Sequence, residues 1–359
     1  VSGSADASQG STEALKIDTS GNIIIANTGG TLYTTTAGTS NFRAGVNAGN
    51  SIAAVSTVNA GAFNTLVGDE AGTAVSTGDG NTLVGYSAGT AVNTSINNTA
   101  VGRDAMLTST TGDNNVALGR EALKRLTTSN ENVAVGSESL KETTTGTQNV
   151  AMGHTAGQYA LTADNSVFIG HSAGKGINGV KLTGNNNTAV GKDAGLLLQG
   201  IAEANTLLGA AAGDNITTGD SNIIIGSGID AASPTADGQL NIGGMIFGTG
   251  GAGGNVGINT GTSAPAEKLH IKDGSTNADV YIKIANDSRD WFMGVEGSNS
   301  DIFSIKTHDA ANLVNIDASG NLGIGTAAPL AQLHITEDSG AGSADIILER
   351  QDTSVSVNN

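Results

Sequence analysis

The pentapeptide Asn-Thr-Leu-Val-Gly stands at Asn64–Gly68 and returns unchanged at Asn81–Gly85. Close variants follow at Asn98–Gly102, Asn115–Gly119, Asn132–Gly136 and Asn149–Gly153. The closing glycines from Gly68 to Gly170 are 17 residues apart every time. Gly191, Gly209 and Gly226 continue at intervals of 21, 18 and 17 residues, and an outlying copy ends at Gly45. Eleven copies at a near-fixed period predict a solenoid in which each copy forms one coil.

Each copy predicts a short β-strand just before its glycine. With the closing glycine as position 0, position −1 is apolar in every copy and position −3 is mostly β-branched, which favours a pleated strand. Position −2 is apolar or small as well. Because alternate residues of a strand face opposite sides, this pattern predicts burial on both faces. One face lines the coil, and the other needs a second buried layer.

Asparagine occupies position −4 in ten of the eleven copies, with Ser166 as the exception. Two interpretations follow from this regularity. The amides stack once per coil into a hydrogen-bonded ladder, or each asparagine opens the turn into its own strand.

The second half of each coil carries a different pattern. Alanine stands at position +3 in nine of the eleven copies, which indicates close approach of backbones. The Ser-, Thr-, Gly- and Asp-rich remainder predicts a corner turn. A segment such as Glu121–Leu126 is equally compatible with one helical turn, so strand and short helix both remain open here.

The composition fits repetitive β architecture. The 359 residues include 53 Gly, 3 Pro and no Cys, and only 14% are charged. Such a chain lacks the large side chains of a single central core, whereas stacked coils bury against their neighbours. One coil offers too little apolar surface to offset the entropy of ordering 17 residues. We therefore predict an elongated all-β solenoid, or β-roll, that assembles as a parallel homotrimer.

The formal net charge of −17 argues against binding to nucleic acids, which requires basic patches. No apolar run approaches the 18 residues of a membrane span, so we expect no membrane insertion. No signal peptide is visible, and Val1 is not an initiator Met. We expect a processed chain or a fragment of a longer one.

The chain divides into five segments. Residues 1–40 predict a β-hairpin around Ser20-Gly21-Asn22. We expect residues 41–230 to form the solenoid and the Gly-rich residues 231–253 to form a neck. We expect residues 254–326 to form a β module and residues 327–359 to begin a second, truncated one.

A longer repeat marks these last two segments. Gly254-Asn255-Val256-Gly257-Ile258 leads to Pro265 and Leu269-His270-Ile271, and Gly320-Asn321-Leu322-Gly323-Ile324 leads to Pro329 and Leu333-His334-Ile335. With the phrase at Ser288–Asp301, this repeat resembles bacteriophage tail-fibre proteins of the kind that carry an endosialidase-type intramolecular chaperone. The 17-residue repeat is similar to repeats in such fibres and to the β-roll heads of trimeric autotransporter adhesins.

The resemblance implies a structural trimeric fibre in the virion. Its partners would be further copies of itself, other tail or fibre proteins, and a host cell-surface receptor, expected to be a glycan. The first alternative is a bacterial surface adhesin or extracellular filament of trimeric β-roll type. The second is a glycan-degrading tailspike, but paired carboxylates beside an aromatic platform, which such an enzyme needs, are not apparent.

Candidate site residues are few. The sequence shows no catalytic constellation and no cofactor motif, so we expect no enzymatic activity and no cofactor. His154 and His171 both follow a closing glycine one coil apart, which predicts stacking about 4.8 Å apart. They are weak candidates for metal ligands, against the alternative of two surface side chains. Asp79, Asp113, Asp164 and Asp220 lie at corners, where Asp usually caps its own backbone rather than binding Ca²⁺.

Overall fold

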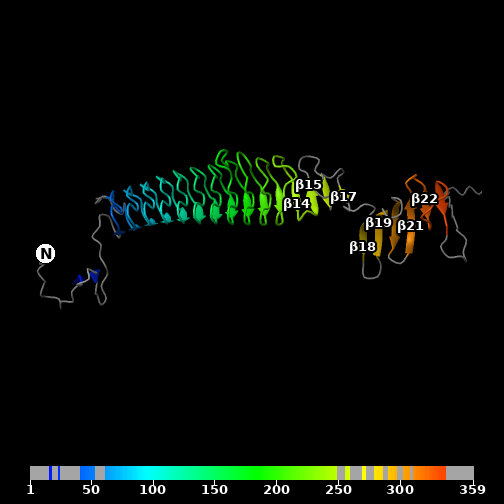
Figure 1. The fold of residues 1–359 in the computed structure, drawn as a ribbon, viewed down its shortest axis with the longest axis horizontal. Coiled ribbons are helices and arrows are strands. Elements are labelled where there is room, and N and C mark those ends of the chain that lie inside the picture. The colour runs from blue at the N-terminus through cyan, green and yellow to red at the C-terminus, as the bar shows by residue number, and fades with distance from the viewer. Residues whose placement is uncertain are drawn as a thin grey trace, which may run out of the picture. The chain divides into compact units, whose positions relative to one another are not determined.

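The computed structural model of the chain describes residues 16–17, 23–24, 41–52, 61–248, 255–258, 269–271, 279–285, 290–296, 302–307 and 310–336. This part of the chain is all-β and contains no helix (Figure 1). It forms a β-solenoid of about 11 turns followed by a small sheet, as the sequence predicts. Most of residues 1–40, Pro265 and residues 337–359 lie outside the described residues. The chain divides into two compact units, residues 1–185 and 186–359.

In the first unit, positions −3 to −1 form one three-residue strand per coil. The strands are β3 (Phe42–Ala44), β4 (Thr65–Val67), β5 (Thr82–Val84), β6 (Thr99–Val101), β7 (Val116–Leu118), β8 (Val133–Val135), β9 (Val150–Met152) and β10 (Val167–Ile169). Neighbouring strands pair in parallel and in register, so each repeat position faces the same position of the next coil. Equivalent residues therefore form columns along the solenoid.

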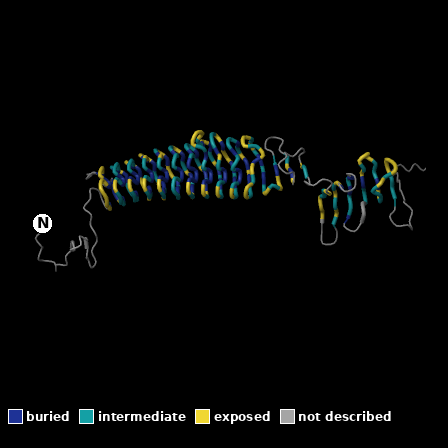
Figure 2. Tube along the Cα trace, viewed as in Figure 1, coloured by how far each residue is buried: buried dark blue, intermediate teal, exposed yellow. Residues whose placement is uncertain are grey.

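The column at position −2 fills the coil interior. Leu66, Leu83, Ala117 and Phe168 are fully buried. Positions −3 and −1 point outward and are half-buried or exposed. Figure 2 shows that buried and exposed stretches alternate within the coils. The described residues of this chain thus bury one face of the strands, and they do not supply the second buried layer that the apolar pattern requires.

The second half of each coil is neither strand nor helix. Its backbone turns through left-handed residues at positions +2 and +4, such as Glu121 (φ 59°) and Leu123 (φ 50°). These residues hydrogen-bond to adjacent coils: the Glu121 N–H donates to the Arg103 carbonyl at 2.9 Å and the Leu123 N–H to the Ser139 carbonyl at 3.1 Å. Bonds between coils replace the i to i−4 bonds of a helix, which settles the choice left open by the sequence.

The core keeps its volume by pairing positions −2 and +4. Where −2 is leucine or phenylalanine, +4 is glycine, as with Leu83 and Gly89. In the coils closed by Gly102, Gly119 and Gly136, −2 is alanine and +4 is large, as with Ala117 and Leu123. A Cβ on Gly89 would lie 2.7 Å from a Leu83 methyl carbon. In these coils either position can provide the large side chain, whereas the coils closed by Gly153 and Gly191 carry the small pairs Ala151–Gly157 and Ala189–Gly195.

The second unit continues the same repeat. Its strands are β11 (Thr188–Val190), β12 (Thr206–Leu208), β13 (Ile223–Ile225) and β14 (Leu240–Ile242), which pair in parallel. β15 (Ile246–Gly248) then pairs antiparallel with β14 and with β16 (Val256–Ile258). β14 and β15 lie inside residues 231–253, the segment that the sequence assigns to a neck.

The longer sequence repeat corresponds to one structural unit that occurs twice. β16 pairs in parallel with β17 (Leu269–Ile271), so that Val256 faces Leu269. β22 (Leu322–Ile324) pairs in parallel with β23 (Leu333–Ile335), so that Leu322 faces Leu333. The strand before each pair, β15 or β21, joins it antiparallel.

The small sheet has six strands in sequence order. β18 (Val280–Ala285), β19 (Asp290–Glu296), β20 (Ile302–Thr307) and β21 (Ala310–Ile316) form an antiparallel meander that continues into β22 and β23. Near the N-terminus, β1 (Lys16–Ile17) pairs antiparallel with β2 (Ile23–Ile24), at the place where the sequence predicts a hairpin.

Candidate functional site

The repeat asparagines form a ladder inside the solenoid. Asn132 is fully buried, and its Oδ1 accepts hydrogen bonds from the backbone N–H and the side-chain amide of Asn149, at 3.0 and 3.1 Å. Its own Nδ2 donates to Asn115 at 3.1 Å and to the Gly146 carbonyl at 2.9 Å. The same bonds repeat along the set Asn64, Asn81, Asn98, Asn115, Asn132 and Asn149. Of the two interpretations, the structure shows the ladder.

The closing glycines occupy a backbone conformation that other residues rarely adopt. Gly68, Gly85, Gly102, Gly119, Gly136 and Gly153 have φ angles between 129° and 142°. A Cβ on Gly119 would lie 2.5 Å from the Gly136 carbonyl oxygen, so the next coil leaves no space for a side chain. The invariance of position 0 therefore has two causes, the φ angle and the close approach of the next coil.

The corner aspartates cap a neighbouring coil rather than their own backbone. Asp79 Oδ1 accepts the Ala62 N–H at 2.6 Å, and Asp113 Oδ1 accepts the Ile96 N–H at 2.8 Å. Asp164 and Asp220 do the same for Thr147 and Glu203. Each partner lies 17 residues earlier, so these carboxylates link coils. The expectation that each caps its own turn is wrong, because the parallel stacking brings the preceding coil's N–H within reach.

His154 and His171 stack on the solenoid surface. Their ring centroids are 5.3 Å apart and their planes lie 20° apart. Ser172 Oγ lies 3.1 Å from His171 Nδ1. Within the described residues, no group of three or more His, Cys, Asp or Glu side chains is arranged to hold a metal ion.

The outward strand columns form an uncharged apolar ribbon. We use this name for positions −3 and −1 of the first unit: Phe42, Ala44, Thr65, Val67, Thr82, Val84, Thr99, Val101, Val116, Leu118, Val133, Val135, Val150, Met152, Val167 and Ile169. Val101, Leu118, Met152 and Ile169 are each between 37% and 42% exposed. None of the sixteen residues is charged, although the chain carries a net charge of −17.

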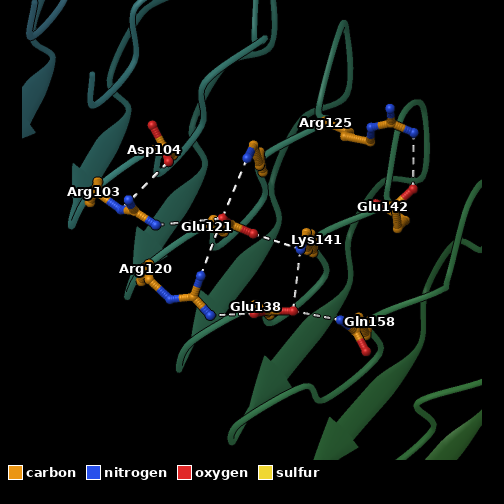
Figure 3. A network of polar contacts seen from close by, with 10 residues as sticks. Arg103, Asp104, Arg120, Glu121, Arg125, Glu138, Lys141, Glu142 and Gln158 are labelled. Carbon is orange, nitrogen blue, oxygen red and sulfur yellow. Dashed lines mark hydrogen bonds and ion pairs between the residues drawn. The ribbon is translucent and has the colours of Figure 1, made fainter. Parts of the chain in front are cut away.

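A network of charged side chains crosses several coils on the turn side (Figure 3). Glu121 is nearly buried and contacts Arg120 at 3.2 Å, Lys124 at 3.4 Å and Lys141 at 2.6 Å. Glu138 forms ion pairs with Arg120 and Lys141 and accepts a hydrogen bond from the side-chain amide of Gln158. Positions +1, +2 and +5 of successive repeats supply these side chains, so the network follows directly from the register.

The network holds its carboxylates in the charged form. The hydrogen bond from Lys141 lowers the pKa of Glu121. Burial opposes ionisation of Glu138, but the cations Lys141 and Arg120 outweigh it and lower its pKa. Burial likewise opposes the charged form of Lys141, and its bonds to the two glutamates raise its pKa nevertheless.

A second charged cluster lies on one face of the six-stranded sheet. Glu296 is 6% exposed, and its Oε1 accepts hydrogen bonds from Tyr281 at 2.7 Å, Ser304 at 3.1 Å and Lys306 at 2.9 Å. The Lys306 ammonium also lies 4.3 Å from the centre of the Tyr281 ring. Burial opposes the carboxylate, but these donors outweigh it and lower the pKa of Glu296 to about 2.

Neither charged cluster is among the candidate residues named from the sequence. The signal for the first was available, because aligning the repeats places Arg103 and Arg120, then Glu121 and Glu138, in single columns. The second had no such signal, because Tyr281, Glu296 and Lys306 come from three strands whose pairing the sequence does not specify.

The described residues contain no helix long and apolar enough to cross a membrane. No protein-family model matches the sequence, and no curated protein and no solved structure is significantly similar to it.

Proposed function

We propose that the chain is a non-enzymatic structural segment of a phage tail fibre, which associates with two further copies and presents its turn side to a host surface glycan. The observation that carries this proposal is the apolar ribbon. It runs along one side of the stacked coils of the first unit, and it is the face that the described residues leave without cover.

A further copy of the same chain is the partner that fits the ribbon. Its residues repeat at the spacing of the coils, about 4.8 Å, so only a partner with the same repeat matches them rung for rung. Parallel copies satisfy this condition. The absence of charge on the ribbon allows copies of a strongly acidic chain to meet there without local repulsion. Three narrow ribbons around one axis form an enclosed core, as the sequence resemblance implies.

Such a fibre works through reach and multivalency. The stacked coils, tied by backbone bonds and the asparagine ladder, keep the surface positions at fixed spacing. Three copies present each surface site three times at one level, which raises avidity without a tight single site.

The test is the solution mass of the intact protein by light scattering. We expect about three times the chain mass of 35.4 kDa. The double variant Val101→Lys/Leu118→Lys places charges in the ribbon, and we expect it to reduce the mass to that of one chain while the β-type circular dichroism spectrum persists. A monomeric wild-type protein would refute the self-association.

The matched control is Thr128→Lys/Thr145→Lys, which adds the same two side chains at exposed positions one coil apart and outside the ribbon. It should keep the oligomeric mass. If it dissociates the oligomer as fully as the ribbon variant does, added charge alone is responsible and the ribbon is not the interface.

A further inference from the structure

Positions +1 to +6 of the middle coils carry more cations than anions, although the corner residues Asp113, Glu131 and Asp164 of the same coils lie outside these positions. Here we consider positions +1 to +6 of the coils closed by Gly102, Gly119, Gly136, Gly153 and Gly170, with the inserted Lys181. The cations are Arg103, Arg120, Lys124, Arg125, Lys141, Lys175 and Lys181, and the anions are Asp104, Glu121, Glu138 and Glu142. A local positive excess in a chain of net charge −17 requires that the remainder be still more acidic.

The charges in this region are arranged in two layers. The side chains of Glu121 and Glu138 are only 10% and 18% exposed, whereas those of Arg103 and Arg120 are 55% and 44% exposed. The carboxylates therefore lie beneath the guanidinium groups and hold them in place. A guanidinium has five N–H donors in a rigid fork, more than its carboxylate contacts here occupy. The outer layer is cationic and already ordered, so binding an anion costs little side-chain entropy.

Arg103 and Arg120 belong to a column that continues, after Ser137 on the middle rung, with His154 and His171. All four stand at position +1, directly after a closing glycine, and all four are exposed. Adjacent rungs are about 4.8 Å apart, so the column spans four intervals, or roughly 19 Å. The stacked imidazole rings add flat faces and N–H donors at one end of this cationic strip.

We propose that Arg103, Arg120, His154 and His171 form a binding strip for an acidic polysaccharide, with the guanidinium groups meeting its carboxylate or sulfate groups. This inference rests on the proposed role in glycan attachment, and it is independent of the number of chains in the fibre. The regular rungs suit a linear polymer, because a chain with repeating anionic groups meets several donors in succession.

Glycan is favoured over nucleic acid by charge density. Duplex DNA carries one negative charge per about 1.7 Å, and a protein of net charge −17 repels such a polymer along most of its length. An acidic polysaccharide has fewer charges per unit length, and it matches a strip of two arginines without requiring a basic surface elsewhere.

The experiment measures binding of the intact protein to immobilised heparin and hyaluronan at neutral pH and low salt. Heparin offers sulfate and carboxylate groups, and hyaluronan carboxylates alone. We expect the double variant Arg103→Gln/Arg120→Gln to bind at least about tenfold more weakly, which corresponds to 1.4 kcal/mol or more. His154→Ala/His171→Ala, which leaves the arginines and their carboxylates intact, should also weaken binding. Binding to heparin alone assigns the strip to sulfated glycans, and binding to both shows that carboxylates suffice.

The matched control is Arg125→Gln/Lys175→Gln. It removes the same two charges from the same turn side but from positions +6 and +5, and Arg125 is as exposed as Arg103, at 59%. We expect less than about threefold loss. Equal losses for the two double variants would show general electrostatic attraction and overturn the strip, as would linear duplex DNA binding as tightly as heparin. The wild-type protein could bind the glycan, and the Arg103→Gln/Arg120→Gln variant lose that binding, even if the wild type proves monomeric. That result would uphold the strip and refute only the self-association.

Discussion

At the scale of single residues, the interior of the solenoid depends on a polar group. Each ladder asparagine is buried, yet its amide is fully bonded to the coils above and below. A buried amide is costly only when its hydrogen-bonding groups lack partners. The ladder therefore fixes the register of the stack, because a shift of one residue would place these amides against apolar side chains.

Asn132→Ala tests the ladder directly. The change removes the acceptor of the buried Asn149 N–H and of its side-chain amide. Each buried group left without a partner costs roughly 1–3 kcal/mol, so we expect urea unfolding to show a loss of about 3 kcal/mol. Asn130→Ala is the control, because the side chain of exposed Asn130 accepts the Asp113 N–H, and water can replace that acceptor. Equal losses for the two variants would mean that the ladder adds nothing beyond an ordinary surface bond.

At the scale of the coil, the side chains at positions −2 and +4 share one space in the core, so a large residue at one position can be moved to the other by a double substitution. Leu123→Gly should cost about 2–5 kcal/mol through the cavity it leaves, and Ala117→Leu about 1–3 kcal/mol through overpacking. The double variant recreates the pairing seen at Leu83 and Gly89, so we expect it to recover most of the loss. Chemical unfolding of the four proteins measures this coupling. Strictly additive effects would contradict shared occupancy of one space.

The Glu296 cluster makes the six-stranded sheet sensitive to acid. The folded-state pKa of about 2 lies below the ordinary value of 4.5. The resulting stabilisation is therefore present above pH 4.5 and is lost as the pH falls from 4.5 towards 2. The shift corresponds to a contribution on the order of 3 kcal/mol at neutral pH. Trp291 on β19 is the chain's single tryptophan and reports unfolding of this sheet by fluorescence.

Glu296→Gln supplies the comparison for this pH dependence. The variant should be less stable than the wild type at pH 7, and the difference should shrink as the pH falls below 4.5. A constant difference between pH 7 and pH 3 would show that the carboxylate charge is not the stabilising element.

At the same scale, the sequence predicts the strands well and the turns poorly. The strands at positions −3 to −1 follow from apolar and β-branched residues before a glycine, and the structure places all of them there. The turns do not follow from local preference, because Glu121 and Leu123 are good helix formers held at positive φ. Hydrogen bonds to the coils on both sides override that preference. The sequence of a single repeat does not predict these bonds, because their partners belong to other repeats. The charged network is a consequence of the same stacking.

At the scale of the whole molecule, a solenoid differs from a globular domain in how far a local loss of stability spreads. Each coil contacts only its neighbours, so stability is approximately a sum of coil terms and interface terms. A defect in one coil should therefore open the adjacent coils first. The six-stranded sheet has its own strand pairing and should respond independently.

Gly119→Ala creates such a defect. Its φ of 142° is strained for any residue with a Cβ, and that atom would lie 2.5 Å from the Gly136 carbonyl oxygen. Measured by hydrogen exchange, protection should fall most in the coils of β6 to β8 and progressively less in coils further away, while β18–β21 remain unchanged. Gly179→Ala is the control, because a Cβ there meets no atom within 4 Å, and its profile should match the wild type. A uniform loss of protection in Gly119→Ala would instead mean that the described coils and the sheet unfold as one cooperative unit. Only in such a unit does strain at one residue reduce the protection of residues that it does not contact.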